Sequence, residues 1–131
     1  MKNLPYEKCL TEGMEKFNFK KISKKRLIKL NNTAVSNYNY ELFVKAMRKK
    51  FGYRSKIRII LSNRKTKITW GTSTFLESRI DLYRHSVLIF LHELAHLFAY
   101  NKNMYIERHG LLFAKTLEKL IEEWTTWQKE L

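Results

Sequence analysis

Apolar residues recur along this chain at spacings of three and four, the period of an amphipathic helix. Such stretches predict helices over about residues 6–17, over 40–51, where Gly52 is suited to end the helix, and from about residue 109 onward. The segment 86–100 is apolar nearly all round, so it predicts a helix that is buried on every side. The core-facing residues of the second and last helices are expected to be Leu42, Phe43, Ala46, Met47 and Phe51, and then Leu112, Phe113, Leu117, Leu120, Ile121 and Trp124.

Three short stretches between residues 57 and 82 alternate apolar and polar side chains, which is the period of half-buried strands. The links between them are short for parallel crossovers, so they favour a small antiparallel meander. We expect one α+β domain over residues 1–131, with N-terminal helices, a three-stranded antiparallel sheet and two C-terminal helices. The inward-facing strand residues are expected to be Ile57, Ile59 and Leu61, then Ile68 and Trp70, then Ile80 and Leu82.

Positive charge is concentrated in the first half of the chain. Residues 1–67 hold 19 Lys and Arg against 4 Asp and Glu, a net charge of +15, whereas residues 68–131 hold 7 against 8, a net charge of −1. This asymmetry predicts a polyanionic partner such as DNA, because cations that face phosphates release condensed counterions and gain affinity. A lysine-rich solubilising surface is the alternative. The candidate DNA contacts are Lys20, Lys21, Lys24, Lys25, Arg26, Lys45, Arg48 and Lys49.

Cysteine content and hydropathy indicate the compartment. The single cysteine, Cys9, can form neither an internal disulfide nor a Cys-rich zinc site, which favours a reducing environment. No stretch reaches the roughly 18 to 20 apolar residues that a membrane span requires, and the first ten residues lack the apolar core of a signal peptide. We therefore expect a soluble cytoplasmic protein with no membrane partner.

Three polar residues interrupt the apolar segment 86–100, and with their neighbours they spell HELAH, an HExxH motif. Four residues turn an α-helix by about 400°, so His92 and His96 project from one face and can bind one metal ion. Glu93, rotated by about 100°, can instead accept a proton from a water molecule at that metal. A buried carboxylate without a partner is unfavourable, so this setting favours a bound cation.

A catalytic zinc ion takes three protein ligands and keeps one position open. His109 is the preferred third ligand, because only 12 residues separate it from His96 and a loop can return it to the metal. The alternatives are glutamates of the last helix, namely Glu118, Glu122 and Glu123. The metzincin continuation is excluded, because it needs glycine and histidine where this chain has Ala99 and Lys102. The sequence predicts one Zn²⁺ per chain.

A second motif follows HELAH. After a dozen residues the chain reads His109-Gly110-Leu111-Leu112-Phe113, an HGxxF pattern that opens a helix. Together the two motifs resemble the SprT-like, or Spartan-type, zinc metallopeptidase domain family. Residues 86–115 carry the resemblance, and the order of elements extends it over about 40–85. The resemblance implies a zincin-like minimal metalloprotease core, zinc on His92, His96 and His109, and Glu93 as the catalytic base.

The predicted function is hydrolysis of peptide bonds by a zinc-bound water that Glu93 activates. The resemblance and the basic half together suggest substrates among proteins associated with DNA, as in the repair of DNA–protein crosslinks. Two alternatives stay open. One is a non-catalytic, zinc-stabilised, basic DNA-binding module, although a purely structural zinc site has no need of Glu93. The other is a metallohydrolase that acts on a non-peptide amide, which the sequence does not separate from a peptidase.

Overall fold

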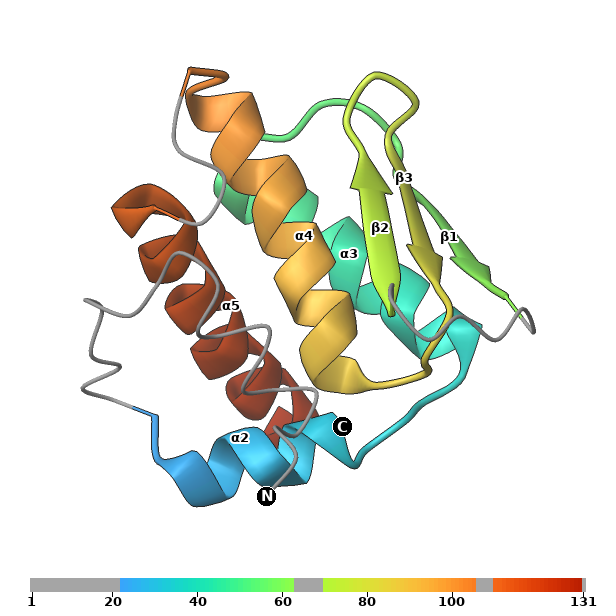
Figure 1. Cartoon of the computed structure of the whole chain (residues 1–131), viewed down its shortest axis with the longest axis vertical. Coiled ribbons are helices and arrows are strands. Elements are labelled where there is room, and N and C mark those ends of the chain that lie inside the picture. The colour runs from blue at the N-terminus through green and yellow to red at the C-terminus, as the bar shows by residue number, and fades with distance from the viewer. Residues whose placement is uncertain (1–21, 63–69, 106–109, 131) are drawn as a thin grey trace.

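Four helices and three strands make up the described part of the chain, which covers residues 22–62, 70–105 and 110–130 of the computed structural model (Figure 1). The elements are α2 (Lys24–Asn31), α3 (Asn37–Phe51), β1 (Arg58–Leu61), β2 (Gly71–Thr74), β3 (Arg79–Leu82), α4 (Val87–Lys102) and α5 (Leu111–Glu130). These elements confirm the predicted α+β class, whereas the helix predicted over 6–17 lies outside the described residues. Within the described ranges, none of the helices is long and apolar enough to cross a lipid bilayer.

Helix α4 occupies the centre of the fold, between α5 on one side and the sheet on the other (Figure 1). Its neighbours bury 12 of its 16 residues, as a segment that is apolar nearly all round predicts. Phe90 of α4 packs on Tyr40 of α3, with ring centroids 4.3 Å apart, and burial raises the pKa of Tyr40 to about 12. The central helix is therefore held from several directions, and the HELAH motif lies on it.

Helix α3 begins and ends at residues whose backbone geometry explains its length. The hydroxyl of Ser36 accepts the backbone N–H of Asn39 at 3.4 Å and caps the helix, so α3 begins three residues before the predicted Tyr40. It ends at Gly52, as predicted, because a φ of 67° is open to glycine without steric cost. The capping serine was not distinguishable from the asparagines around it by pattern alone.

The core face of α3 differs from the predicted one. Leu42 and Ala46 are exposed, although the sequence placed them inward. The helix is instead oriented by aromatic packing on α5, where the ring of Phe43 lies 4.9 Å from that of Trp124. The buried residues of α3 are Tyr40, Phe43, Val44 and Met47. On α5 the prediction was closer, because every predicted core residue is buried except the half-buried Leu112.

The sheet is mixed, which corrects the predicted antiparallel meander. Strand β3 is central: β2 pairs with it antiparallel across a short hairpin, and β1 pairs with it parallel. The prediction assumed that each strand pairs with the next one in the sequence. In the structure β2 returns the chain instead, so that β3 can run beside β1 in the same direction without a crossover helix.

The second strand also lies further along the chain than the alternation indicated. It begins at Gly71, after Trp70, whereas residues 67–69 of the predicted strand lie outside the described residues. Polar residues fill β2, and all of them are half-buried, so no apolar alternation marks them. In the other two strands, Ile59, Ile80 and Leu82 are buried as predicted, and Leu61 is half-buried.

Candidate metal centre

The two histidines and the glutamate of the HELAH motif lie in the middle of α4. His92 and Glu93 are buried, with 5% and 8% of their surface exposed, and His96 is half-buried one turn further on. The start of the helix is anchored, because the N–H of Val87 donates to the carbonyl of Thr33 at 2.8 Å. The three side chains are thus presented by a helix that is fixed on all sides, and His96 is the most accessible of them.

The rings of His92 and His96 approach each other through their Nε2 atoms, which are 3.2 Å apart. Two nitrogens on one tetrahedral zinc ion, at bond lengths of 2.0–2.1 Å, lie about 3.3 Å apart. The pair therefore fits two corners of a zinc site with little movement. The same spacing also suits a hydrogen bond from a protonated Nε2 to an unprotonated one, so the geometry accommodates either a proton or a metal between the rings.

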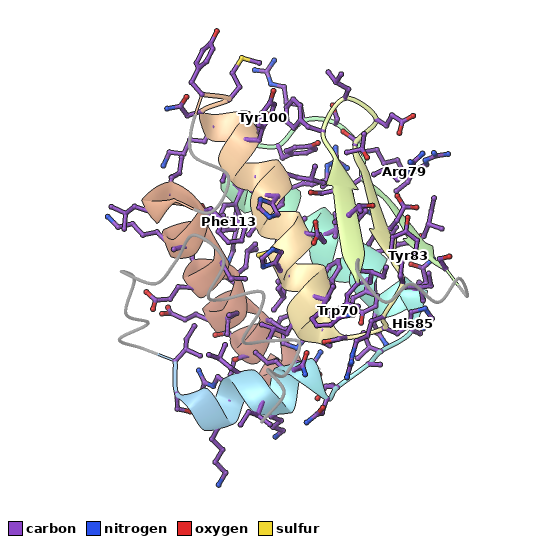
Figure 2. All side chains as sticks on the ribbon, viewed as in Figure 1. Trp70, Arg79, Tyr83, His85, Tyr100 and Phe113 are labelled. Carbon is purple, nitrogen blue, oxygen red and sulfur yellow. The ribbon has the colours of Figure 1, made fainter. Side chains whose placement is uncertain are left out.

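The first turn of α5 covers the two histidines. The ring of Phe113 stacks on His96 with centroids 4.2 Å apart and an interplanar angle of 25°, and it meets His92 edge-on at 4.9 Å. Figure 2 shows Phe113 against the middle of α4. This contact fixes the orientation of both rings and brings the beginning of α5 to the HELAH face.

Among the described residues, no third metal-ligating side chain joins the histidine pair. In the ranges that the structure describes, no three metal-ligating side chains come together, so the glutamates of α5 do not join His92 and His96. One of them, Glu123, is paired with Lys50 of α3, with Oε2 and Nζ 2.7 Å apart. His109 lies outside the described residues. Glutamates of α5 were the alternative third ligands, and none of the three joins the histidine pair in the described structure: Glu118, Glu122 and Glu123.

His85, the fourth histidine of the chain, is separate from this centre. It lies two residues before α4, and its Nε2 is 3.2 Å from the carbonyl oxygen of Ser62. Figure 2 places it at the opposite end of the sheet from Tyr100. It therefore provides a natural control for histidine substitutions.

Gly71 is a site residue that the sequence reasoning missed. It is the first residue of β2, and a Cβ atom there would lie 2.9 Å from Cγ2 of Ile89 and 3.1 Å from Cγ of Glu93. Only glycine lets the strand approach the helix this closely, and the strand in turn limits where the Glu93 side chain can go. A glycine inside a strand often marks such an approach, and that was the available signal.

The outer edge of β2 is open to a further strand. In the described sheet, β2 is an edge strand. Just before it, the N–H of Tyr83 donates to the carbonyl of Trp70 at 2.9 Å, so these two residues face each other as a hydrogen-bonded pair. Because antiparallel pairing alternates, the backbone groups of Gly71 and Ser73 point away from β3, to the free edge. Main-chain donors and acceptors therefore line the sheet beside the HELAH helix.

The predicted DNA contacts divide into several groups. Lys20 and Lys21 lie outside the described residues, and the side chain of Lys24 is not described. Lys25 on α2 is exposed and Arg26 is half-buried. The predicted contacts that the structure describes are therefore divided between two helices, α2 and α3. On α3, Lys45 and Lys49 are exposed, and Arg48 donates to the backbone carbonyls of Tyr53 and Arg54.

A groove of about 620 Å³ runs between α3 and the outer strand β1. Four cationic side chains and one carboxylate line it, beside a tyrosine that is 67% exposed. These residues are Lys45, Arg48, Lys56, Arg58, Glu41 and Tyr38. The structure therefore gathers cations from α3, from β1 and from the link between them.

The centre on α4 combines two histidine nitrogens 3.2 Å apart, a buried carboxylate one residue after the first histidine, and a strand that is at the edge of the described sheet. Together these groups are suited to bind a metal ion and an extended chain, and the carboxylate is suited to accept and deliver a proton. Comparisons with known protein families, with characterised proteins and with solved structures find no match to this chain.

Proposed function

We propose that this protein is a zinc-dependent metallopeptidase of the SprT-like type, with a zincin-like catalytic core. The observation that supports it most is the pair of Nε2 atoms 3.2 Å apart, with Glu93 as the next residue in the helix and an open strand edge alongside. A chance HExxH sequence has no reason to lie beside a strand that leaves room for its glutamate. Glu93 favours an enzyme over a metal site that only stabilises the fold, because a purely structural zinc site has no need of that carboxylate.

His92, His96 and His109 are the proposed zinc ligands. The first two have the required spacing, and the contact of Phe113 with both rings brings the first turn of α5, which follows His109, to the same face. Zinc held by these residues supplies a Lewis acid for the carbonyl group under attack. Phe113 orients the two histidine rings and excludes water from one side of them.

Glu93 is the proposed general base and, later, the general acid. Its carboxylate takes a proton from the attacking water and delivers it to the amine that leaves when the C–N bond breaks. It is 8% exposed and lies against Gly71, so it has few alternative positions. A confined carboxylate at a fixed distance from the substrate strand suits repeated proton transfer.

The peptide substrate is proposed to bind as an additional strand on β2. The N–H and carbonyl groups of Gly71 and Ser73 are available at the outer edge for this pairing. A strand bound there runs along the HELAH face of α4. This requirement for an extended main chain favours peptides over the small non-peptide amides of the alternative function.

The proposed function is tested with the purified, zinc-loaded chain and unfolded casein as substrate. We expect fragments that accumulate with time, disappear when a chelator removes the zinc, and return when zinc is added back. Chain that holds zinc but releases no fragments would support the non-catalytic, zinc-stabilised module. Hydrolysis of small amides without hydrolysis of casein would support the non-peptide metallohydrolase.

Single-stranded DNA is a second proposed ligand, favoured by the groove between α3 and β1. Its cations and Tyr38 offer phosphate contacts and a surface for base stacking. The double substitution Lys45→Glu and Lys56→Glu is expected to weaken oligonucleotide binding, and to lower the slope of log affinity against log salt by about 1.4, since each phosphate contact of a single strand contributes about 0.7. Fluorescence anisotropy at several salt concentrations measures both quantities.

The matched control for DNA binding makes the same charge change elsewhere. Lys102 and Lys115 are exposed and do not line the groove, so their double substitution by glutamate alters net charge alone. An equal loss of affinity in both double variants would show that net charge, rather than the groove, attracts DNA. Wild-type chain that does not bind DNA at low salt would reduce the basic half to a solubilising surface.

A further inference from the structure

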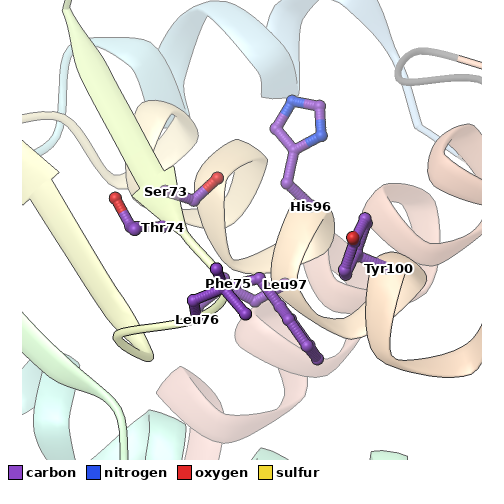
Figure 3. Close-up of a pocket in the computed structure, with 7 residues that line it drawn as sticks. All are labelled: Ser73, Thr74, Phe75, Leu76, His96, Leu97 and Tyr100. Carbon is purple, nitrogen blue, oxygen red and sulfur yellow. The ribbon is translucent and has the colours of Figure 1, made fainter. Parts of the chain in front are cut away.

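A cavity of about 480 Å³ opens beside His96, where the end of β2 meets the C-terminal half of α4 (Figure 3). Its walls carry aliphatic, aromatic and hydroxyl side chains, and no lysine, arginine, aspartate or glutamate is among the described residues that line it. These residues are Ser73, Thr74, Phe75, Leu76, His96, Leu97 and Tyr100. The size is in the range of ligand-binding pockets, which are commonly about 300 to 1,000 Å³.

Aromatic packing shapes the apolar wall of this cavity. The rings of Phe75 and Tyr100 meet with centroids 4.5 Å apart, and Phe75 also contacts Tyr53 of the neighbouring loop at 6.0 Å. Leu97, between His96 and Tyr100 on the helix, is 1% exposed. Phe75, Leu97 and Tyr100 therefore form the packed part of the wall, whereas Leu76, which also lines the cavity, is 96% exposed.

The cavity shares residues with both parts of the proposed active site. His96 belongs to the proposed zinc ligands, and Ser73 belongs to the free edge of β2. A strand that pairs with β2 at Ser73 directs alternate side chains toward and away from the helix, because successive residues of a strand face opposite sides. One side chain near the cleaved bond therefore meets the cavity.

We propose that this cavity binds a large apolar side chain of the peptide substrate, close to the cleaved bond. The inference rests on the proposed peptidase function and adds the substrate class to it: extended segments that carry a phenylalanine, leucine or methionine at one position. An uncharged wall without a counter-ion disfavours lysine, arginine, aspartate and glutamate there, because a charge that leaves water needs a partner. Such segments are exposed in unfolded proteins and hidden in folded ones.

The first experiment maps cleavage sites of the zinc-loaded chain in a peptide library by mass spectrometry. We expect one position within two residues of the cleaved bond to be enriched in apolar residues, with kcat/KM about 10- to 100-fold above that for aspartate at the same position. The variant Tyr100→Lys places a cation in the wall, and it is expected to shift the preference toward acidic residues. Tyr105→Lys, at a side chain that is 90% exposed and outside the cavity, is the matched control and is expected to keep the wild-type preference.

A second variant and a binding measurement keep the test independent of folding and of turnover. Tyr100→Ala opens the wall without adding charge and is expected to reduce the apolar preference at least about 10-fold. Fluorescence anisotropy measures how tightly zinc-free chain binds a phenylalanine peptide and its aspartate counterpart. The phenylalanine peptide is expected to bind about 10-fold more tightly.

The outcomes separate the cavity from the peptidase function. Cleavage without any side-chain preference, or a preference that Tyr100→Lys and Tyr105→Lys alter equally, would overturn the role of the cavity and leave the peptidase function standing. Selective binding without cleavage would overturn the peptidase function, while it would support the cavity as a site for apolar side chains. Neither binding nor cleavage would overturn both.

Discussion

The variant Glu93→Gln is expected to lose peptide hydrolysis by a factor of about 10² to 10⁴, the usual contribution of a general acid–base group, and still to bind one zinc ion. Glutamine has nearly the volume of glutamate, so it fits beside Gly71, where a Cβ atom would already lie 3.1 Å from Cγ of Glu93. It cannot accept a proton from water at neutral pH. The expected loss is therefore in kcat, with little change in substrate binding.

The measurement pairs initial rates of casein hydrolysis with zinc content by elemental analysis. Glu41→Gln is the matched control, because Glu41 is an exposed carboxylate on α3, away from the HELAH face, and its removal is expected to leave both quantities unchanged. Loss of zinc from Glu93→Gln would show that Glu93 is a ligand rather than a base. Full activity of the same variant would remove it from the mechanism.

The two C-terminal helices, α4 and α5, could be predicted from sequence because their signals are local. A segment that is apolar nearly all round has to be buried, and α4 is buried. The spacing of His92 and His96 fixes their common face through helix geometry alone, and their Nε2 atoms meet as that geometry requires. The stripe on α5 followed from the same period of 3.6 residues.

The sheet could not be predicted in the same way, because strand pairing is a long-range choice. Nothing in the alternation of β1 indicates whether it pairs with β2 or with β3, since its inward residues are buried by either neighbour. The parallel pairing of β1 with β3 decides which strand is left at the free edge. It thereby decides that β2, with Gly71 and Ser73, lies beside Glu93.

The cavity beside His96 was also beyond the sequence. Its residues come from the end of β2, from the turn after it and from α4, about 20 positions apart, and they meet only once the sheet order is set. Gly71 was the single local sign that β2 approaches α4, because a glycine within a strand is unfavourable unless another group approaches it closely. The described groups of the proposed active site could thus be predicted along one helix, whereas the proposed substrate-facing side could not.

Zinc content is expected to fall from about one ion per wild-type chain to almost none in His96→Ala, with an affinity loss well beyond the roughly 10- to 100-fold that follows loss of a group which only hydrogen-bonds to a metal ligand. Removal of this ring leaves one nitrogen of the pair that is 3.2 Å apart. His96 is half-buried, so the variant is expected to fold. His109→Ala is expected to lose zinc similarly. Glu118→Gln, which removes one of the alternative glutamate ligands, is expected to keep zinc.

Thermal unfolding gives a second measurement that does not depend on activity. Zinc that binds only the folded chain stabilises it by about 2.7 kcal/mol at a free concentration 100 times the Kd, so added zinc raises the melting temperature of the wild type. That rise is expected to vanish in His96→Ala and His109→Ala and to persist in His85→Ala, whose ring lies beside the carbonyl of Ser62. A rise that persists in His109→Ala but vanishes in Glu118→Gln would assign the third ligand to α5 itself. It would also mean that α5 has to turn toward the histidine pair to bind zinc, because its glutamates do not join that pair in the described structure.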